Sequence, residues 1–273
     1  MPSLSMSPQL FVLFSTLVEE HAGITYGARD AQVFESKVTD HVLELGYASL
    51  LDYYYRLRYD DRDGLELRRL IEALTVHETY FFRELAPMHE LVEHLAHAVE
   101  ERGHARVWSA ACATGEEPYT LAMLLDDRKI LPQVEIIATD ISAAALARAR
   151  SGRHSRRSLR DGHPVATATR YLEVSGQNVI VAPSLRSAVR FERLNLLDSP
   201  AIAELGAFDV ILCRNVLIYF GEPRVHSVAA TLASALRPDG LLAVGVSESL
   251  LRAGTSLVCD ERGGSFFYRR ARS

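Results

Sequence analysis

The fold of this 273-residue chain is decided by residues 107–119, which read VWSAACATGEEPY. An apolar run typical of a buried strand passes into a turn of small residues, and two acids and a proline then open a helix. Domains of the α/β class present a nucleotide-like ligand at such a junction between a strand end and a helix start. The stretch therefore predicts an α/β domain with a ligand site at this junction.

The two acids at the start of this helix, Glu116 and Glu117, indicate the charge of the ligand. A helix N-terminus attracts anions, and dinucleotide-binding folds use it to hold a pyrophosphate. Two carboxylates would repel a phosphate and suit a cationic ligand that carries amine and hydroxyl groups. S-adenosylmethionine (SAM), with its sulfonium and amino groups, is such a ligand, so the site favours a methyl donor over NAD.

The composition is that of an ordinary globular protein with a formal charge of −5, which does not favour nucleic acid as a partner. Three widely spaced cysteines predict reduced core residues of a cytoplasmic protein. Three histidines within residues 89–97 lack an acid or cysteine partner, so we expect a solvated helix face and no metal site. Neither a signal peptide nor a membrane span is expected, since no long apolar run is present.

The N-terminal third of the chain has helix signals and almost no strand signals. Apolar residues recur at helical spacing within residues 11–18 and 33–45, and glycines punctuate the segment. We predict a small all-α domain of three to five helices over residues 1–85. A linker helix is expected over residues 86–104, before an α/β domain that spans residues 105–273.

Strand and helix patterns alternate through the α/β domain, which predicts a parallel, doubly wound sheet. The expected parallel strands cover residues 107–109, 134–139, 189–194, 208–213 and 241–246. A closing antiparallel hairpin is expected from residues 257–260 and 265–269, which flank a Gly-Gly turn.

Residues 151–188 interrupt this alternation and predict a small β insert. Residues 171–174 and 178–181 have the pattern of a short hairpin. Residues 148–170 hold seven arginines against one aspartate, so the insert is a candidate partner-binding surface. The alternative is a solvated loop, and the sequence does not decide between the two.

Polar residues follow the second and third predicted strands. Asp140 ends the second strand, where an acid can accept both ribose hydroxyls of an adenosine-containing cofactor. A helix-capping acid is the alternative. Asn195 follows the third strand, and its amide could bind an adenine edge while Leu196 packs on the ring. Taken alone this second signal is weak, because Asn is also common in turns.

Two further clusters carry side chains beyond what local structure needs. Arg214, Asn215 and Tyr219 follow the fourth strand, at the sheet edge where open α/β folds bind ligands. The alternative is a structural salt bridge and a core aromatic. Arg83 follows three aromatic residues in a helical segment, and its guanidinium can hold a carboxylate in bidentate fashion.

Together these motifs resemble one family, the chemotaxis receptor glutamate O-methyltransferases, or CheR. The similarity covers nearly the whole chain, and the order of Phe-Phe-Arg, Ala-Thr-Gly-Glu-Glu-Pro-Tyr and Cys-Arg-Asn-Val is highly specific. The matching blocks are residues 77–83, 108–119, 138–140, 195–197, 213–220 and 237–249.

The resemblance implies a class I, Rossmann-like SAM-methyltransferase domain with a small β insert, preceded by the helical domain. It also implies that SAM donates a methyl group to glutamate carboxylates on chemoreceptor cytoplasmic helices, leaving S-adenosylhomocysteine. By motif position, Arg83 and Tyr219 would lie beside the methyl-transfer site. The residues that would contact SAM are His77, Thr79, Arg83, Glu117, Asp140, Asn195, Leu196, Arg214 and Asn215.

Two departures from the family pattern concern His77, where Asn is usual, and His154, near which an aromatic residue is usual. The first motivates an alternative function, a non-catalytic SAM-binding regulator. A methyltransferase acting on nucleic acid or a small metabolite is a further alternative, disfavoured by charge and by the helical domain. A monomer is expected, and residues 171–181 could hold a receptor C-terminal peptide by strand addition, as the resemblance implies for some members.

Overall fold

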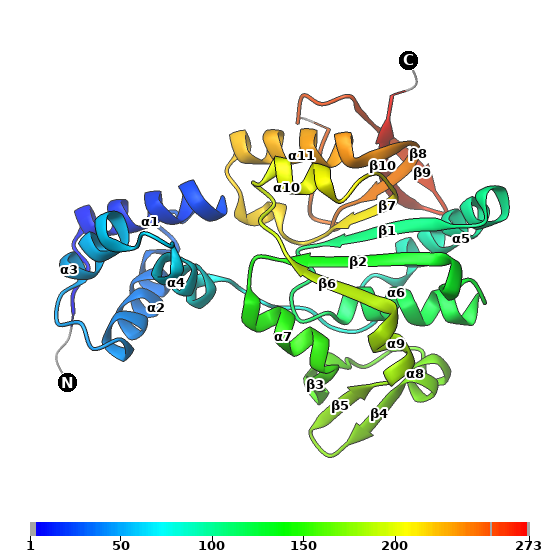
Figure 1. Cartoon of the computed structure of the whole chain (residues 1–273), viewed down its shortest axis with the longest axis horizontal. Coiled ribbons are helices and arrows are strands. Elements are labelled where there is room, and N and C mark those ends of the chain that lie inside the picture. Colours follow the sequence, from blue (N-terminus) through cyan, green and yellow to red (C-terminus); the bar gives the residue numbers. More distant parts are fainter. Residues whose placement is uncertain (1–3, 252, 272–273) are drawn as a thin grey trace. The chain divides into compact units, whose positions relative to one another are not determined.

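The computed structural model describes residues 4–251 and 253–271 (Figure 1). Backbone contacts divide the chain into two compact units. The first comprises residues 1–76 together with Tyr219–Gly221, and the second comprises His77–Ile218 and residues 222–273. None of the helices in the described part of the chain is long and apolar enough to cross a membrane.

The N-terminal unit is a helical bundle, and two of its helices begin at serine caps. Its elements are α1 (Pro8–Ala22), α2 (Ala31–Glu44), α3 (Leu50–Tyr55), a π-helical turn (Arg56–Asp60) and α4 (Leu65–Leu74). Ser7 accepts the backbone N–H of Leu10 and so caps α1. The rings of Phe14, Phe34 and Tyr53 are fully buried between the helices, which confirms the predicted all-α character.

The second unit is built on one seven-stranded sheet with the order β6-β2-β1-β7-β8-β10-β9. The strands are β1 (Ala105–Ala110), β2 (Val134–Asp140), β6 (Val189–Arg193), β7 (Phe208–Cys213), β8 (Leu236–Ala243), β9 (Leu257–Arg262) and β10 (Ser265–Arg270). The first five are parallel, and β10 pairs antiparallel with both β8 and β9. Strand order reverses between β1 and β7, which is where such sheets open a crevice for a ligand.

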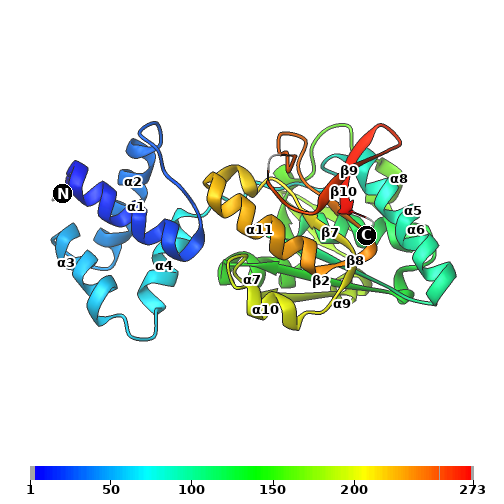
Figure 2. The same ribbon diagram turned by 90° about the horizontal axis from the view of Figure 1, so that it is seen from above.

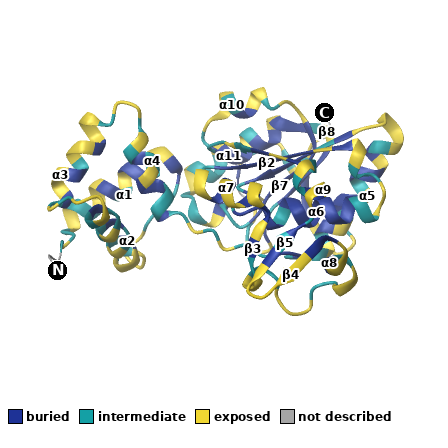
Figure 3. Cartoon of the chain, turned by 60° about the horizontal axis from the view of Figure 1, so that its bottom comes forward, coloured by how far each residue is buried: buried dark blue, intermediate teal, exposed yellow. Residues whose placement is uncertain are grey.

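Helices cover both faces of this sheet. They are α5 (Leu85–Arg102), α6 (Glu116–Asp127), α7 (Ala143–Ser151), α10 (Ser199–Glu204) and α11 (Glu222–Ala235). Helices α6 and α7 lie on one face, and α10 and α11 lie on the other (Figure 1). Figure 2 shows α5 beside α6, and α5 also packs against β1 and β7. The central strands β1, β2 and β7 are almost fully buried, because helices cover them from either side, and β2 and β7 are dark blue in Figure 3.

The insert forms a second, three-stranded sheet with the order β3-β5-β4. Its elements are β3 (Arg153–Ser155), a 3-10 turn (Arg156–Ser158), α8 (Val165–Tyr171), β4 (Leu172–Ser175), β5 (Asn178–Val181) and α9 (Pro183–Ala188). The predicted hairpin is the β4–β5 pair. Strand β3 was not predicted, because its three polar residues have no strand pattern of their own and pair with β5 only in the folded insert.

The predicted fold class is therefore confirmed, with one strand placed wrongly. The sequence predicts this strand over residues 241–246, after the Pro-Asp-Gly stretch at residues 238–240. Strand β8 instead begins at Leu236, pairs there with Phe208, and shifts register before Leu241 pairs with Val210. A bulge thus absorbs the Pro-Asp-Gly stretch into the strand, a tertiary effect that local turn propensity does not report.

Candidate active site

The turn after β1 brings the backbone close to α7. Ala111, Ala113 and Gly115 all have positive φ angles, of 57°, 48° and 93°. A Cβ on Gly115 would lie 2.8 Å from the Cβ of Ala149, so only glycine allows α6 to start this close to α7. The turn leaves the carboxyl ends of β1 and β2 side by side at one edge of the sheet.

Glu117, on the first turn of α6, is held by two donors. Ser109 Oγ donates to Glu117 Oε1 at 2.8 Å, and Arg214 Nη1 donates to Oε2 at 2.9 Å. The Arg214 guanidinium also donates to Glu84 Oε2 at 2.8 Å and to the carbonyl oxygen of Arg83 at 3.0 Å. Arg214 thus joins the segments that carry Arg83 and Glu117, which sequence analysis could only place separately.

This guanidinium is deeply buried, with 2% of its side chain exposed. Burial alone would lower the pKa of Arg214, but Glu117 and Glu84 favour the charged form, and the pKa is raised overall. Arg214 Nε is buried and has no hydrogen-bond partner among the residues that the structure describes. The cation is therefore fixed in place by two carboxylates.

The segment before α5 has an unusual backbone. Phe82 and Glu84 have φ angles of 63° and 53°, in the left-handed region that non-glycine residues rarely occupy. The backbone N–H of Phe82 donates to Thr120 Oγ1 at 3.0 Å, which ties this turn to α6. Arg83 lies within it with 27% of its side chain exposed, 5.3 Å from the centre of the Tyr80 ring. The strained turn leaves this guanidinium reachable from solvent.

Asp140, at the end of β2, closes the site on its other side. Its Oδ2 accepts from the N–H of Ala113 at 2.8 Å, and its Oδ1 accepts from the N–H of Ser142 at 2.9 Å. Burial raises the pKa of Asp140, although these two N–H groups and nearby His77 oppose the rise. His77 Nε2 is buried without a hydrogen-bond partner in the described part of the chain, and Thr79 is half-buried in the same segment.

Asn195 and Leu196 follow β6, the neighbour of β2. Asn195 Oδ1 accepts from the N–H of Leu197 at 3.0 Å, which orients the amide, and Leu196 is 8% exposed. Asn215 follows β7 and has a φ angle of 58°, which Asn tolerates better than most residues. Both amides therefore stand at the carboxyl ends of strands, as predicted.

The charges at this edge fit the ligand that the sequence predicts. Four carboxylates, those of Glu84, Glu117, Asp140 and Glu248, stand against two guanidiniums, those of Arg83 and Arg214. Negative charge is therefore in excess at this edge, which favours a ligand with a net positive charge such as a sulfonium. The buried, unpartnered Nε2 of His77 is a further polar atom that a bound ligand could satisfy.

Comparison with known proteins identifies this arrangement. The family described as CheR methyltransferase, SAM binding domain, matches residues 77–260. The chain belongs to the CheR methyltransferase family.

Chemotaxis protein methyltransferase 1 of Pseudomonas aeruginosa is 34% identical to this chain over 250 residues, covering 88% of this chain and 90% of its own. A chemotaxis protein methyltransferase of Vibrio parahaemolyticus is 34% identical over 257 residues and covers 92% of each chain. One from Listeria monocytogenes is 30% identical over 243 residues, 88% of this chain and 90% of its own. The similarity therefore extends into the N-terminal helices, well beyond the SAM-binding domain.

In this CheR chain the backbone of Tyr219 is held by residues of the N-terminal unit. The N–H and Oγ1 of Thr25 donate to the carbonyl oxygen of Tyr219, at 2.8 and 3.1 Å. Ile24 and Phe220 form an isolated antiparallel bridge beside them. The part of Tyr219 in methyl transfer stays a prediction.

The structure separates the roles of the two acids that open α6. Glu116 is 2% exposed and accepts from Thr114 Oγ1 at 2.6 Å, Ser158 Oγ at 2.9 Å and His154 Nδ1 at 3.0 Å. Burial alone would raise the pKa of Glu116, but these hydrogen bonds lower it overall. Glu116 therefore anchors the insert through His154 and Ser158, whereas Glu117, the predicted SAM contact of the pair, faces Ser109 and Arg214. Glu116 and His154 are 38 residues apart in the sequence, so no local sequence pattern indicates this contact.

Two acids at this edge were not predicted from the sequence. Glu84 pairs with Arg214, and Glu248 accepts several backbone N–H groups after β7 and β8. Glu84 directly follows the matching block at residues 77–83, and Glu248 lies within the block at residues 237–249. The sequence around a glutamate does not indicate which distant residue it will contact. In residues 4–251 and 253–271, no group of three or more His, Cys, Asp or Glu side chains could hold a metal ion.

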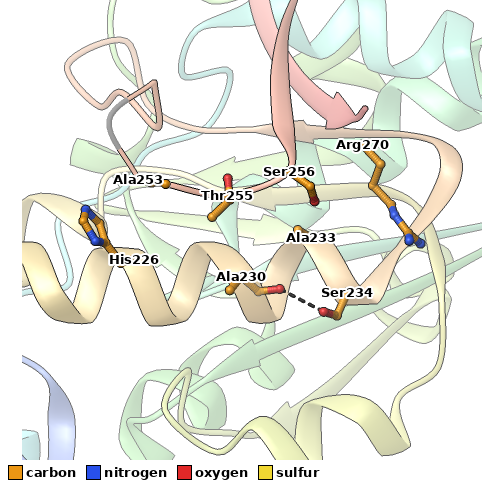
Figure 4. A pocket seen from close by; sticks show the side chains of 9 residues that line it. His226, Ala230, Ala233, Ser234, Ala253, Thr255, Ser256 and Arg270 are labelled. Carbon is orange, nitrogen blue, oxygen red and sulfur yellow. Dashed lines mark hydrogen bonds between the residues drawn. The ribbon is translucent and has the colours of Figure 1, made fainter. Parts of the chain in front are cut away.

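A separate pocket of about 420 Å³ lies between α11 and residues 253–256 (Figure 4). Its lining includes His226, Ser234, Thr255 and Arg270. None of the residues predicted to bind SAM lines it.

Proposed function

We propose that this chain transfers the methyl group of SAM to glutamate side-chain carboxylates on the cytoplasmic helices of chemoreceptors, leaving S-adenosylhomocysteine. The observation that supports this most is the Arg214 bridge. It joins the CheR motif segments around Arg83, Glu117 and Arg214 at the carboxyl edge of one sheet. The family membership of the chain supplies the class of reaction.

The residues at this edge divide the proposed cofactor site into three parts. Asp140 would accept the ribose hydroxyls, since a carboxylate at the end of β2 is placed for them. Asn195 and Leu196 would hold the adenine. The other predicted contacts, His77, Thr79, Arg83, Glu117, Arg214 and Asn215, would surround the amino-acid portion. When bound, SAM supplies an electrophilic methyl group, and the sulfur keeps the electron pair of the broken S–C bond.

The acceptor needs positioning more than activation. A glutamate carboxylate is already ionised at neutral pH, so no general base is required. Holding the acceptor in line with the methyl group can supply roughly 7–11 kcal/mol in favourable cases. Arg83, 27% exposed, would orient the incoming carboxylate, and Tyr219 would hydrogen-bond near the reacting centre.

Labelled methyl transfer tests this proposal. Tritiated SAM is incubated with a purified receptor cytoplasmic fragment, and alkali then releases methyl esters as volatile methanol. Base-labile label on glutamate is expected for the native chain. Arg83→Ala and Tyr219→Phe should each lower kcat more than they weaken S-adenosylhomocysteine binding. Methylation by Arg83→Ala at the native rate would refute the role of that residue.

The arginine-rich segment supports a docking role for the insert. Arg160 pairs with Glu78 at 2.8 Å, and Arg170 pairs with Asp127 at 2.5 Å. Arg156 and Arg157 are exposed, and no ion pair joins them to another residue in the described part of the chain. They would attract acidic receptor helices, so reversing both charges should raise the KM for receptor at low salt and less at high salt.

The free edge of β4 supports the proposal of a tethering peptide. Strand β4 pairs only with β5 in the described sheet, and three of its four residues are exposed. A receptor C-terminal peptide could add there as a further strand. Cross-linking a peptide to a cysteine placed at Glu173 would test this, with a scrambled peptide as control.

We propose that the protein acts as a monomer, which light scattering would check.

A regulator that binds SAM without turnover is the second candidate, and His77 is the observation that favours it. Its buried, unpartnered Nε2 stands where the CheR pattern has Asn. Cofactor binding without transfer to any of several receptors, with transfer restored by His77→Asn, would establish this alternative.

A further inference from the structure

A single carboxylate, that of Glu248 in the loop after β8, holds the backbone of the loop that follows β7. Glu248 Oε2 accepts from the N–H of Asn215 at 2.7 Å, and its Oε1 accepts from the N–H groups of Leu217 at 2.7 Å and Ile218 at 3.3 Å. A charged acceptor forms stronger hydrogen bonds than a neutral one. These N–H groups lie beyond the end of the strand, where no ladder partner takes them.

The same carboxylate is itself fixed by its own turn. The N–H of Gly245 donates to Glu248 Oε2 at 2.6 Å, and the N–H of Glu248 donates to the carbonyl oxygen of Gly245 at 2.8 Å. Residues 245–248, which we call the 245–248 turn, follow β8, and β8 pairs with β7 in the sheet. The two loops therefore leave neighbouring strands at the same edge.

The side chain of Asn215 is also placed by this turn. A Cβ on Gly245 would lie 2.4 Å from Asn215 Nδ2 and 2.9 Å from Glu248 Oε2. Glycine at this position therefore lets the amide lie against the backbone of the turn. Asn215 has a positive φ angle of 58°, which contacts on both its N–H and its side chain help to hold.

We infer that Glu248 is a positioning residue for methyl transfer, which sets Asn215 and the turn leading to Tyr219 through their backbone N–H groups. The inference rests on the proposed roles of Asn215 and Tyr219. Glu248 needs no contact with SAM or with the acceptor. It acts by fixing a loop whose residues make those contacts, and Ile218, its last partner, directly precedes Tyr219.

The test compares Glu248, which holds the loop at the carboxyl end of β7, with Asp209, a buried carboxylate near the amino end of β7. Asp209, the second residue of β7, is 3% exposed and accepts from Arg102 Nη2 at 2.5 Å and from the N–H of Arg106 at 2.8 Å. Asp209→Asn should lower the melting temperature, while kcat and the Kd for S-adenosylhomocysteine stay within about twofold of native. It therefore controls for loss of a structural carboxylate.

Glu248→Gln keeps the size of the side chain but replaces one acceptor oxygen by an NH2 group, which cannot accept from the backbone N–H groups around it. We expect a roughly tenfold weaker Kd for S-adenosylhomocysteine by calorimetry, which corresponds to about 1.4 kcal/mol, and a lower kcat. Amide hydrogen exchange of residues 214–219, measured without cofactor, should speed up in Glu248→Gln and not in Asp209→Asn. Glu248→Asp keeps the charge on a shorter arm and should fall between Glu248→Gln and native.

Gly245→Ala provides an independent route to the same defect, because its Cβ would displace Asn215 and Glu248. If Glu248→Gln and Gly245→Ala behave like Asp209→Asn, with altered stability alone, the inference is wrong. Asn215→Ala separates this failure from failure of the proposed site. Unchanged binding and turnover in Asn215→Ala would refute the role of Asn215, whereas defects there but not in Glu248→Gln would refute only the role of Glu248.

Discussion

Replacing Arg214 by alanine tests whether the buried cation holds the candidate active site together. Its guanidinium is 2% exposed and contacts two carboxylates, those of Glu84 and Glu117, which are 17% and 15% exposed. The substitution would leave two carboxylates close together without their shared cation. Removing one partner of a buried ion pair costs about 3–5 kcal/mol. Because both acids retain some solvent, we expect the lower end, about 3 kcal/mol.

For a domain of this size, 1 kcal/mol shifts the melting temperature by roughly 2–4 °C, so Arg214→Ala should melt roughly 6–12 °C below native. The assay is thermal unfolding followed by circular dichroism, with calorimetry of S-adenosylhomocysteine binding at a temperature where the variant is folded. Binding should weaken as well, since Glu117 loses the donor that fixes it.

Arg190→Ala is the matched control, because this arginine also pairs with two carboxylates, Glu135 at 3.3 Å and Glu192 at 2.8 Å. Its side chain is 51% exposed, and exposed pairs contribute about 0.2–1 kcal/mol. The control should therefore melt within roughly 4 °C of native. An equal drop in melting temperature in Arg190→Ala and Arg214→Ala would show that burial of the Arg214 cation does not determine its contribution to stability.

Three further predictions concern the same edge of the sheet. Asp140→Asn should weaken S-adenosylhomocysteine binding about tenfold by calorimetry, a loss of about 1.4 kcal/mol, because an amide has one acceptor oxygen and no charge, whereas the carboxylate has two acceptor oxygens. Gly115→Ala should lower the free energy of unfolding in urea by about 2 kcal/mol, through its φ of 93° and its contact with Ala149. Glu116, whose pKa is lowered in the folded state, stabilises the protein above its ordinary pKa of 4.5, and this contribution is lost as pH falls through the lower folded value. In Glu116→Gln, the free energy of unfolding should therefore fall less steeply as the pH drops below 4.5 than it does in the native protein. The same pH dependence in both proteins would contradict this prediction.

The strand and helix pattern of the second unit could be predicted because burial leaves a direct mark on sequence. Strands β1, β2 and β7 are apolar runs because helices cover both faces. Asp140 is the last residue of β2, and Asn215 follows the end of β7. The parallel direction of the strands could be predicted because they alternate with helices along the chain. The polar residues at the carboxyl edge of the sheet were recognisable because their polarity interrupts an apolar pattern, and their contact with SAM stays a prediction.

What could not be predicted depends on contacts between distant segments. His154 meets Glu116 across 38 residues, and Glu84 meets Arg214 across 130. The pairing partner of a polar side chain depends on how loops fold back, which hydrophobic periodicity does not encode. Strand β3 was missed for the same reason, since β5 provides its ladder.

The three cysteines provide a chemical measure of how often this edge opens. Cys112 lies in the turn after β1 and Cys213 ends β7, and burial raises the pKa of both thiols well above the ordinary value, whereas Cys259 is exposed. A thiol reagent should therefore label Cys259 at once. Labelling of the other two requires a local opening of the strands that carry the cofactor site. Their labelling rate, with Cys259 first replaced by serine, would report that opening directly, and a bound cofactor should slow it.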